Sequence, residues 1–347
     1  MLKVLMVGLG GIGQRHLRNL RTLLGKEVQV SAWRVRRRPD VLTDQLTLER
    51  GEDLEKKYRI EVFPELLQAL AAKPDVVLVT NPSSLHIPVA MAAAEAGCHL
   101  FIEKPLSHNL DGVPELVSLV ERKRLTALVG YQIRFHPAFR QIRQWLAEGE
   151  IGSPLSVRAE VGEFLPGFHP YENYREMYAA RGDLGGGVVL TQIHELDYLY
   201  ALFGMPRQVF SLGGHLSSLE IEVEDVASTL LECITPDGRV LPVHLLQDYI
   251  QRPPSRTCQI IGNEGKIVWD YHANRIDLFD TRGNSKEGRT FEGFQRNQMF
   301  LDELRHYLRC LEGQESPRVT LRDGASSLQI ALAIRRSLET GRPVKVE

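Results

Sequence analysis

The chain has 347 residues, of which 43% are hydrophobic and 25% charged, so it is long enough for about two domains of ordinary globular composition. Its 42 basic and 44 acidic residues leave a formal charge of -2, which provides no electrostatic field to hold a nucleic acid. No apolar run approaches a membrane span, and we expect a cytoplasmic protein without nucleic-acid or membrane partners. The four cysteines form no CxxC pair, so neither disulfides nor a thiolate metal site is expected.

The first stretch follows the pattern of strand, glycine turn and helix. Residues 4–7 are an apolar run typical of a buried strand, and Gly8, Gly10 and Gly13 lead from it into a helical pattern. In this context the glycines permit a tight turn, close approach of a pyrophosphate, and close packing of the helix on the strand. The pattern predicts a dinucleotide site; a purely structural glycine turn is the alternative.

The second predicted strand, residues 28–33, ends where the dinucleotide fold usually places an Asp or Glu for the adenosine 2'-hydroxyl. Arg34 stands there instead, and arginines 36–38 follow it. Because a guanidinium suits a 2'-phosphate, we predict that NADP is favoured over NAD. The alternatives are a solvated basic turn and a ribose contact made by Asp40.

The fold class predicted is α/β, with a doubly wound parallel sheet in residues 1–125 and an α+β domain with a large, mainly antiparallel open sheet in residues 126–347. The strands expected after the second are 76–79, 99–102, 126–130, 155–161, 208–213, 226–234, 240–247, 257–261, 266–270 and 275–279. The helices expected after the first are 40–57, 64–72, 84–96, 111–123, 137–147, 187–203, 295–311 and 321–340.

Several segments together resemble the Gfo/Idh/MocA family, which comprises glucose-fructose oxidoreductase, inositol dehydrogenase and their relatives. The segments are Gly8–Gly13 with Arg15 and His16, Asn81-Pro82 with His86, Glu103-Lys104-Pro105, Arg134-Phe135, Gly185–Gly187, His194–Asp197, Gly262–Gly265 and the tail from Asn297 to Gly341. The resemblance implies a Rossmann domain, a second domain whose open sheet often serves oligomerisation, and reversible hydride transfer at a sugar or polyol carbon. The predicted cofactor-binding residues are Gly8, Gly10, Gly11, Ile12, Gly13, Arg15, Arg34, Asn81, Pro82, His86, Glu103 and Lys104.

Lys104 and His194 are the predicted catalytic residues. Lys104 would stabilise a developing alkoxide, and its alternative is a surface lysine paired with Glu103. His194 would transfer the proton, because imidazole titrates near neutrality; its alternative is a buried, satisfied histidine. On the expected helix, His194 lies one turn from Asp197 and from Leu190, where the family usually has an aspartate, so His194 acts with Lys104 alone or another group orients it. HELD is not HExxH, and no catalytic zinc is expected.

The loop over residues 164–175 combines aromatic rings with donors and acceptors, a composition suited to a polar ring. It resembles a subset of the family with an HPYExYR segment, often linked to sugars for surface polysaccharides. An aromatic loop packed on its own domain is the alternative. The predicted substrate-binding residues are Lys104, Arg134, His169, Tyr174, Arg175 and His194, where the arginines would suit a carboxylate or phosphate.

These features predict an NAD(P)-dependent oxidoreductase that acts on a sugar, polyol or nucleotide-sugar. The alternative is a catalytically weak, dinucleotide-responsive regulator with the same fold. Because a large apolar sheet face is rarely left bare, we also expect a homodimer or homotetramer packed through the open sheet.

Overall fold

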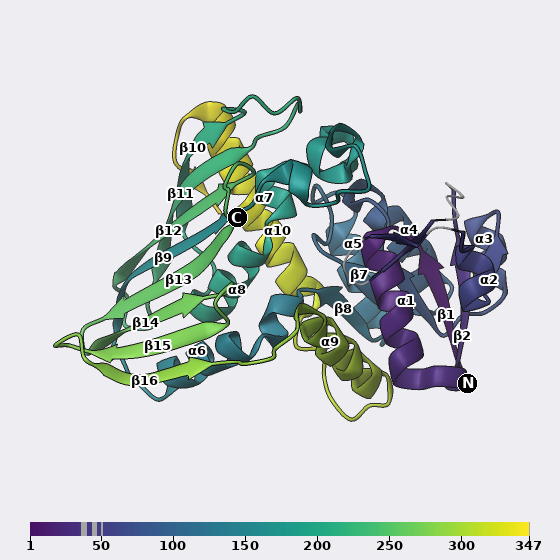
Figure 1. Ribbon diagram of the computed structural model, residues 1–347, viewed down its shortest axis with the longest axis horizontal. Coiled ribbons are helices and arrows are strands. Elements are labelled where there is room, and N and C mark those ends of the chain that lie inside the picture. Colours follow the sequence, from purple (N-terminus) through teal and green to yellow (C-terminus); the bar gives the residue numbers. More distant parts are fainter. Residues whose placement is uncertain (36–39, 44–46, 50, 347) are drawn as a thin grey trace. The chain divides into compact units, whose positions relative to one another are not determined.

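The structure, a computed structural model, describes residues 1–35, 40–43, 47–49 and 51–346. It divides the chain into two compact units, coloured by sequence in Figure 1. The first unit comprises residues 1–131, 169–173 and 296–325, and the second comprises 132–168, 174–295 and 326–347. The sequence-based division had placed residues 296–325 with the second domain. No helix in the described part of the chain is long and apolar enough to cross a membrane.

A six-stranded parallel sheet forms the centre of the first unit, in the order β5-β2-β1-β6-β7-β8. Its strands are β1 (Leu2–Val7), β2 (Val28–Trp33), β5 (Glu61–Phe63), β6 (Val76–Val79), β7 (His99–Glu103) and β8 (Ala127–Gly130). The strand order reverses direction between β1 and β6, which is where doubly wound sheets bind their ligands. The predicted parallel sheet is therefore confirmed, although the three-residue β5 was not predicted.

The first unit also contains helices, most of which connect these strands. They are α1 (Gly11–Leu24), α2 (Leu54–Tyr58), α3 (Leu66–Ala71), α4 (His86–Glu95), α5 (Val113–Arg122) and α9 (Arg296–Leu311), with the short 3-10 helices η1 (Gly25–Glu27) and η2 (Ser83–Leu85). The expected helix over residues 40–57 is wrong. β3 (Val41–Leu42) and β4 (Leu48–Glu49) pair there instead, and α2 begins only after Asp53, whose side chain caps it by accepting from Lys56 N at 2.9 Å.

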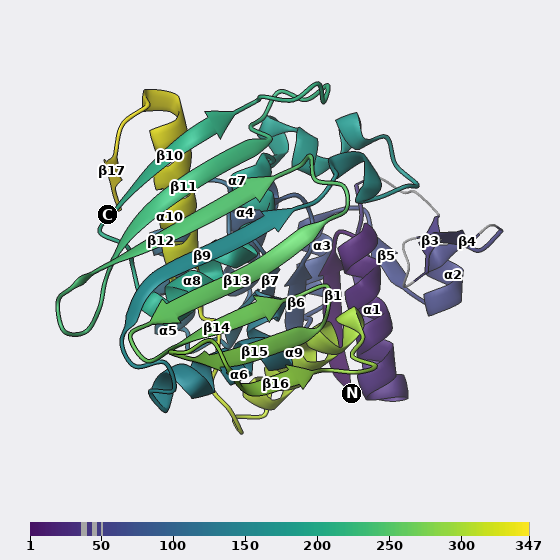
Figure 2. The ribbon, with the colours of Figure 1, turned by 60° about the vertical axis from the view of Figure 1, so that its left-hand side comes forward.

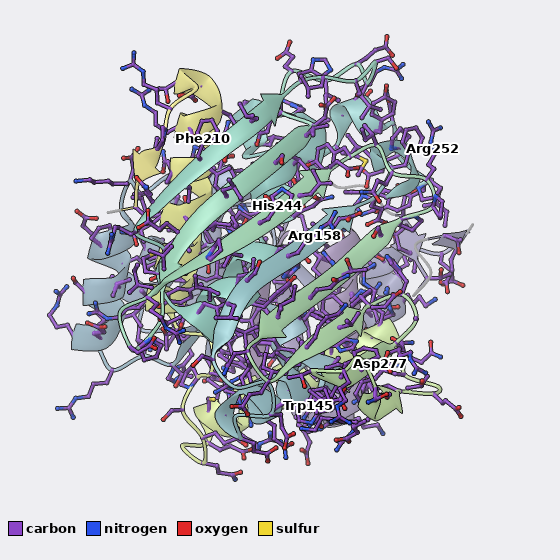
Figure 3. All side chains as sticks on the ribbon, turned by 90° about the vertical axis from the view of Figure 1, so that its left-hand side faces the viewer. Trp145, Arg158, Phe210, His244, Arg252 and Asp277 are labelled. Carbon is purple, nitrogen blue, oxygen red and sulfur yellow. The ribbon has the colours of Figure 1, made fainter. Side chains whose placement is uncertain are left out.

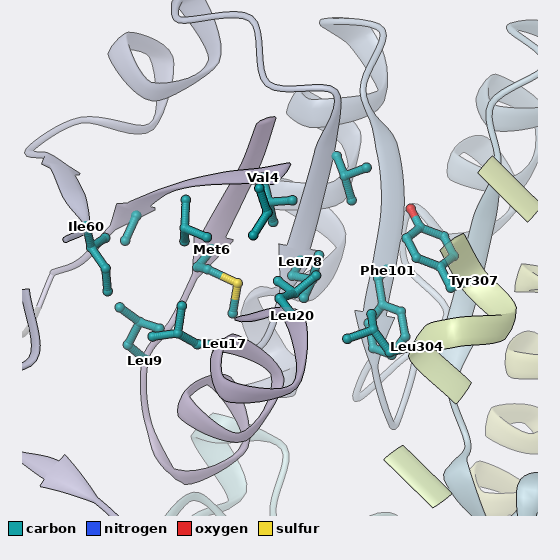
Figure 4. Close-up of a cluster of buried hydrophobic side chains, with 14 of the residues drawn as sticks. Val4, Met6, Leu9, Leu17, Leu20, Ile60, Leu78, Phe101, Leu304 and Tyr307 are labelled. Atoms are coloured by element: carbon teal, nitrogen blue, oxygen red, sulfur yellow. The ribbon is translucent and has the colours of Figure 1, made fainter. Parts of the chain in front are cut away.

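The hydrophobic core of the first unit joins segments that are far apart in the sequence (Figure 4). Met6 on β1 and Leu17 on α1 are fully buried, as β-strand and helix pack face to face. Phe101 on β7 meets Tyr307 on α9 edge-on, with ring centroids 5.5 Å apart, and Leu304 lies in the same cluster. Helix α9 is therefore an integral part of the core under the parallel sheet.

The second unit is built on a nine-stranded sheet in the order β16-β15-β14-β13-β9-β12-β11-β10-β17 (Figure 2). Only the β9–β12 pair is parallel, so the predicted large, mainly antiparallel sheet is confirmed. Its strands are β9 (Pro154–Gly162), β10 (Gln208–Gly214), β11 (Val226–Ile234), β12 (Val240–Asp248), β13 (Ser255–Gly262), β14 (Gly265–Asp270), β15 (Arg275–Asp280), β16 (Ser285–Thr290) and β17 (Val344–Lys345). Strands β16 and β17 were not predicted from the sequence.

Helices cover one face of this sheet (Figure 1). They are α6 (Pro137–Ala147), α7 (Val188–Thr191), α8 (His194–Phe203) and the residues of α10 (Leu321–Thr340) that belong to this unit; short 3-10 helices are η3 (Gln132–Phe135), η4 (Leu165–Gly167), η5 (Tyr174–Glu176), η6 (Tyr178–Ala180) and η7 (Gly182–Leu184). The opposite face, here called the open face, carries a cross-strand row. In that row Phe210 is paired with Leu230, Leu230 with His244, and His244 with Arg158 (Figure 3).

Candidate functional site

The glycine turn after β1 has the geometry that a dinucleotide requires. Gly8 has a φ of +93°, and a Cβ on it would lie 2.8 Å from the backbone of Asn81. A Cβ on Gly13 would lie 2.3 Å from Gly8 O, whereas one on Gly10 would meet nothing within 4 Å. Gly8 and Gly13 are thus needed for packing, and Gly10 leaves open space at the start of α1. No described side chain caps this helix, so the predicted Gly11 and Ile12 begin it with backbone amides suited to an anion.

The loop after β6 lies against this turn and holds a buried acceptor without a partner. Asn81 Oδ1 is buried and accepts no hydrogen bond from any described residue, which fits a ligand donor at this position. The ring of His86 holds the loop, because its Nε2 lies 2.8 Å from Asn81 O and its Nδ1 lies 2.9 Å from Pro105 O. Burial lowers the pKa of His86, outweighing the two carbonyl oxygens that favour its charged form. Pro82, another predicted cofactor-binding residue, lies between Asn81 and His86 in the sequence, at the N-terminus of η2.

Glu103 is the last residue of β7, and Lys104 follows it at the same edge of the sheet. The buried carboxylate of Glu103 lies 2.6 Å from His16 Nε2 on α1 and also accepts from Lys104 N at 3.2 Å. Glu103 therefore links α1 to the end of β7. The side chain of Lys104 is half-buried at the strand end. Its predicted catalytic role stays a prediction.

The end of β2 brings Arg34 to a carboxylate that the sequence did not reveal. Arg34 Nη1 donates to Glu55 Oε1 at 2.8 Å, and the arginine side chain is only 4% exposed. Asp40, the alternative ribose ligand, is exposed, and its backbone carbonyl accepts from Gln14 Nε2 at 2.9 Å. The basic turn at 36–38 lies outside the described residues.

Arg15, a predicted cofactor-binding residue, contacts α9. Its Nη1 donates to Asn297 Oδ1 at 3.1 Å, and its guanidinium carbon lies 5.0 Å from the centre of the Phe300 ring. In this arrangement the arginine fastens α1 to the helix that completes the core.

In the second unit, the expected helix over residues 187–203 is broken, and the expectation that Leu190 and His194 share one helix face is wrong. Helix α7 ends at Thr191, and α8 begins at His194. The cause is a tertiary hydrogen bond: Gln192 O accepts from the side chain of Gln247 at 3.0 Å instead of from the next helical turn. Leu190 is fully buried on α7.

His194 is buried beside an amide. Gln132 Nε2 lies 3.1 Å from His194 Nε2, and both residues are 5% exposed. The carboxylate of Asp197 pairs with Arg134, whose Nε and Nη2 donate to its two oxygens at 2.8 and 2.7 Å. Gln132 was not predicted as a site residue, although it lies just after β8 and so fits the strand-end rule that predicted Glu103.

The remaining substrate candidates lie in the aromatic loop. Tyr174 accepts a hydrogen bond from Glu220 N at 3.3 Å, and Arg175 forms an ion pair with Glu220 while its guanidinium stacks 4.8 Å from the Tyr174 ring centre. His169, which belongs to the first unit, stacks on Tyr171 with ring centroids 5.4 Å apart. Across the described residues, no group of three or more His, Cys, Asp and Glu side chains could hold a metal ion.

Comparison with known proteins agrees with this geometry. The profile of the GFO/IDH/MocA oxidoreductase family, with an NAD-binding Rossmann fold, matches residues 2–131, and the profile of the GFO/IDH/MocA C-terminal domain matches residues 139–268. The chain is 25% identical to myo-inositol 2-dehydrogenase of Thermotoga maritima, over 100% of this chain and 99% of that protein. It is 32% identical to UDP-N-acetylglucosamine 3-dehydrogenase of Acidithiobacillus ferrooxidans, over 67% of this chain and 66% of that protein.

A solved structure shows the same fold. The WlbA dehydrogenase from Bordetella pertussis, in complex with NADH and UDP-GlcNAcA, superposes with a TM-score of 0.79 at 20% identity, covering 100% of this chain and 99% of that one.

Proposed function

Because the chain belongs to the Gfo/Idh/MocA family of NAD-binding oxidoreductases, we propose that it transfers a hydride to or from a secondary alcohol or ketone carbon of a sugar, polyol or nucleotide-sugar. The observation that carries this proposal is the glycine turn, with open space at Gly10 and the unpartnered Asn81 Oδ1 beside it. A bound NAD(P) would supply the hydride acceptor or donor. The other residues must then bind the substrate, stabilise the alkoxide and move a proton.

Two side chains are assigned to that chemistry. Lys104 carries a cationic ammonium at the carboxyl end of β7, where it would stabilise a developing alkoxide. His194 would take the hydroxyl proton in oxidation and return it in reduction, since imidazole exchanges a proton near neutral pH. Position 190, where the family usually has a carboxylate, is Leu190 in this chain, and one contact of His194 is with the Gln132 amide.

A nucleotide-sugar for surface polysaccharides is the substrate that we favour. The support comes from the HPYENYR segment, residues 169–175, and from similarity to UDP-N-acetylglucosamine 3-dehydrogenase. Arg175 is half-exposed and would suit a phosphate or carboxylate, as would Tyr174 and His169 as hydrogen-bonding groups. Arg134 forms an ion pair with Asp197 on α8. It would therefore support the substrate site indirectly, by holding α8 in place.

For the cofactor, we favour NADP over NAD. Arg34 directly follows β2, where dinucleotide folds usually contact the adenosine 2'-substituent, and a guanidinium would pair well with a phosphate there.

The test is turnover on a panel of polyols, free sugars and UDP-sugars, followed by cofactor fluorescence. Lys104→Ala should lower kcat across the whole pH range, and His194→Ala should also remove one limb of the pH-rate profile, each by about a hundredfold or more. Arg322→Ala, which removes an exposed surface ion pair with Glu121, is the matched control and should leave turnover unchanged. Binding of dinucleotide without turnover on any member of the panel would favour the regulator instead.

A further inference from the structure

We propose that Glu55 is a specificity-determining residue for the dinucleotide, acting through its ion pair with Arg34 to weaken the preference for a 2'-phosphate. This inference rests on the proposed function only in that the first unit binds a dinucleotide. It adds a residue that lies outside the glycine turn and outside the strand end where specificity is normally read.

The two side chains meet although they are 21 positions apart in the sequence. Arg34 Nη1 lies 2.8 Å from Glu55 Oε1, and the arginine and glutamate side chains are 4% and 34% exposed. The buried guanidinium is therefore held by a carboxylate that still reaches solvent. A charge-assisted hydrogen bond of this length is among the stronger polar contacts in proteins.

The position of Glu55 is fixed by the helix that carries it. Leu54 is fully buried, and Asp53 caps α2 by accepting from Lys56 N. The backbone carbonyl of Glu55 also accepts from Ile60 N at 2.9 Å, which closes the end of the helix. The carboxylate is thus delivered to Arg34 from an anchored turn rather than from a loose loop.

Charge decides the effect on the ligand. A 2'-phosphate carries between one and two negative charges near neutral pH, so it is attracted to the Arg34 guanidinium, with which Glu55 is already paired. With the ion pair intact, the phosphate must compete with a carboxylate for the same guanidinium. The 2'-hydroxyl of NAD is uncharged and does not need the Arg34 guanidinium, so the ion pair does not weaken NAD binding. The pair therefore shifts the relative affinity toward NAD, while Arg34 can still bind the phosphate of NADP.

The experiment measures the Kd of NADH and of NADPH by cofactor fluorescence on the full chain, for the wild type, Glu55→Gln, Arg34→Ala and the double variant. Glu55→Gln should raise the ratio of the NADH Kd to the NADPH Kd by about tenfold. In the Arg34→Ala background the same change should alter the ratio by less than about threefold. Glu27→Gln removes an equal charge from an exposed residue at the opposite end of β2 and should leave the ratio unchanged.

Three results would overturn the inference. An unchanged ratio in Glu55→Gln, with thermal unfolding like that of the wild type, would show that the ion pair does not act on specificity. A tenfold rise that persists without Arg34 would show that the carboxylate acts on the phosphate directly. Failure of both dinucleotides to bind the wild type would overturn the proposed function as well. If Glu55→Gln unfolds, Glu55→Ala serves in its place, and a rise in the ratio supports the inference.

Discussion

At the scale of single residues, the amide of Gln132 gives His194 a partner without charge. An amide can donate from its nitrogen or, after rotation, accept at its oxygen, so it can hydrogen-bond to either protonation state of an imidazole. It does not stabilise the imidazolium as a carboxylate would.

Gln132→Glu should therefore move the His194 limb of the pH-rate profile to higher pH by about one unit or more, because the new carboxylate would favour the imidazolium. The measurement is kcat/KM between pH 5 and 9 with the best substrate of the panel. Gln132→Ala is the control: it should lower kcat without that upward shift. A limb that stays in place in Gln132→Glu, in an enzyme that still turns over, would show that His194 is not the proton carrier.

The same residues show what the sequence could and could not predict at this scale. The strand-end rule located Asn81, Glu103 and Lys104, because the carboxyl ends of parallel strands are set by short-range patterns. Glu55 could not be found in that way. Its contact with Arg34 depends on where α2 packs, which no spacing in the sequence reveals.

At the scale of the element, α6 is capped by the residue before it, His136, which must stay neutral to do so. His136 Nδ1 accepts from Ala138 N at 3.1 Å and so caps the helix. Its ring is buried against Phe294 and Trp269, with centroids 4.8 and 5.2 Å away. Burial, aided by nearby arginines, lowers the pKa of His136 to about 3. A proton on Nδ1 would remove the cap and place a charge among aromatic rings.

The folded state therefore binds this proton less readily than the unfolded state, whose histidine titrates near pH 6.5. The stabilisation is complete above pH 6.5 and is lost as the pH falls toward 3. The His136→Asn variant keeps a side chain that can cap the helix, but that side chain does not titrate. Between pH 7 and 5, the free energy of unfolding should fall by about 2 kcal/mol less in the variant than in the wild type, as measured by urea unfolding. Equal pH dependence in both proteins would contradict the assignment.

Elements were predicted well where periodicity alone determines them, and poorly where tertiary hydrogen bonds intervene. The strand β11 and the helices α6 and α10 have the predicted bounds. The helix expected over 187–203 is split because the Gln247 side chain takes the carbonyl of Gln192. Strand β16 was missed because its six residues, SKEGRT, are held by pairing with β15 rather than by a hydrophobic pattern.

At the scale of the whole molecule, the open face of the nine-stranded sheet is the surface that we expect to mediate assembly. It combines Phe210 and Leu230 with the polar His244 and Arg158 in one cross-strand row (Figure 3). Leu230 is 53% exposed there. A homodimer or homotetramer packed on this row would bury the apolar side chains.

Leu230→Glu should convert such an oligomer to a monomer at micromolar concentration, because a carboxylate would be buried in the contact. Sedimentation velocity measures the change. Leu67→Glu is the control, since Leu67 is 75% exposed on α3 in the first unit, and should leave the sedimentation coefficient unchanged. A wild-type chain that already sediments as a monomer would rule out this assembly.

Residues 296–325 also limit how the protein can be divided. Leu304 and Tyr307 fill the core of the first unit, and Val319 O accepts a hydrogen bond from Val129 N at 3.1 Å. A fragment ending at residue 131 would lack Leu304 and Tyr307, which would leave a cavity in its core, and Val129 N would lose its hydrogen-bond acceptor. The nucleotide-binding unit of this enzyme is therefore not a contiguous module, and a chimaera that exchanges it with another dehydrogenase must exchange residues 296–325 together with residues 1–131.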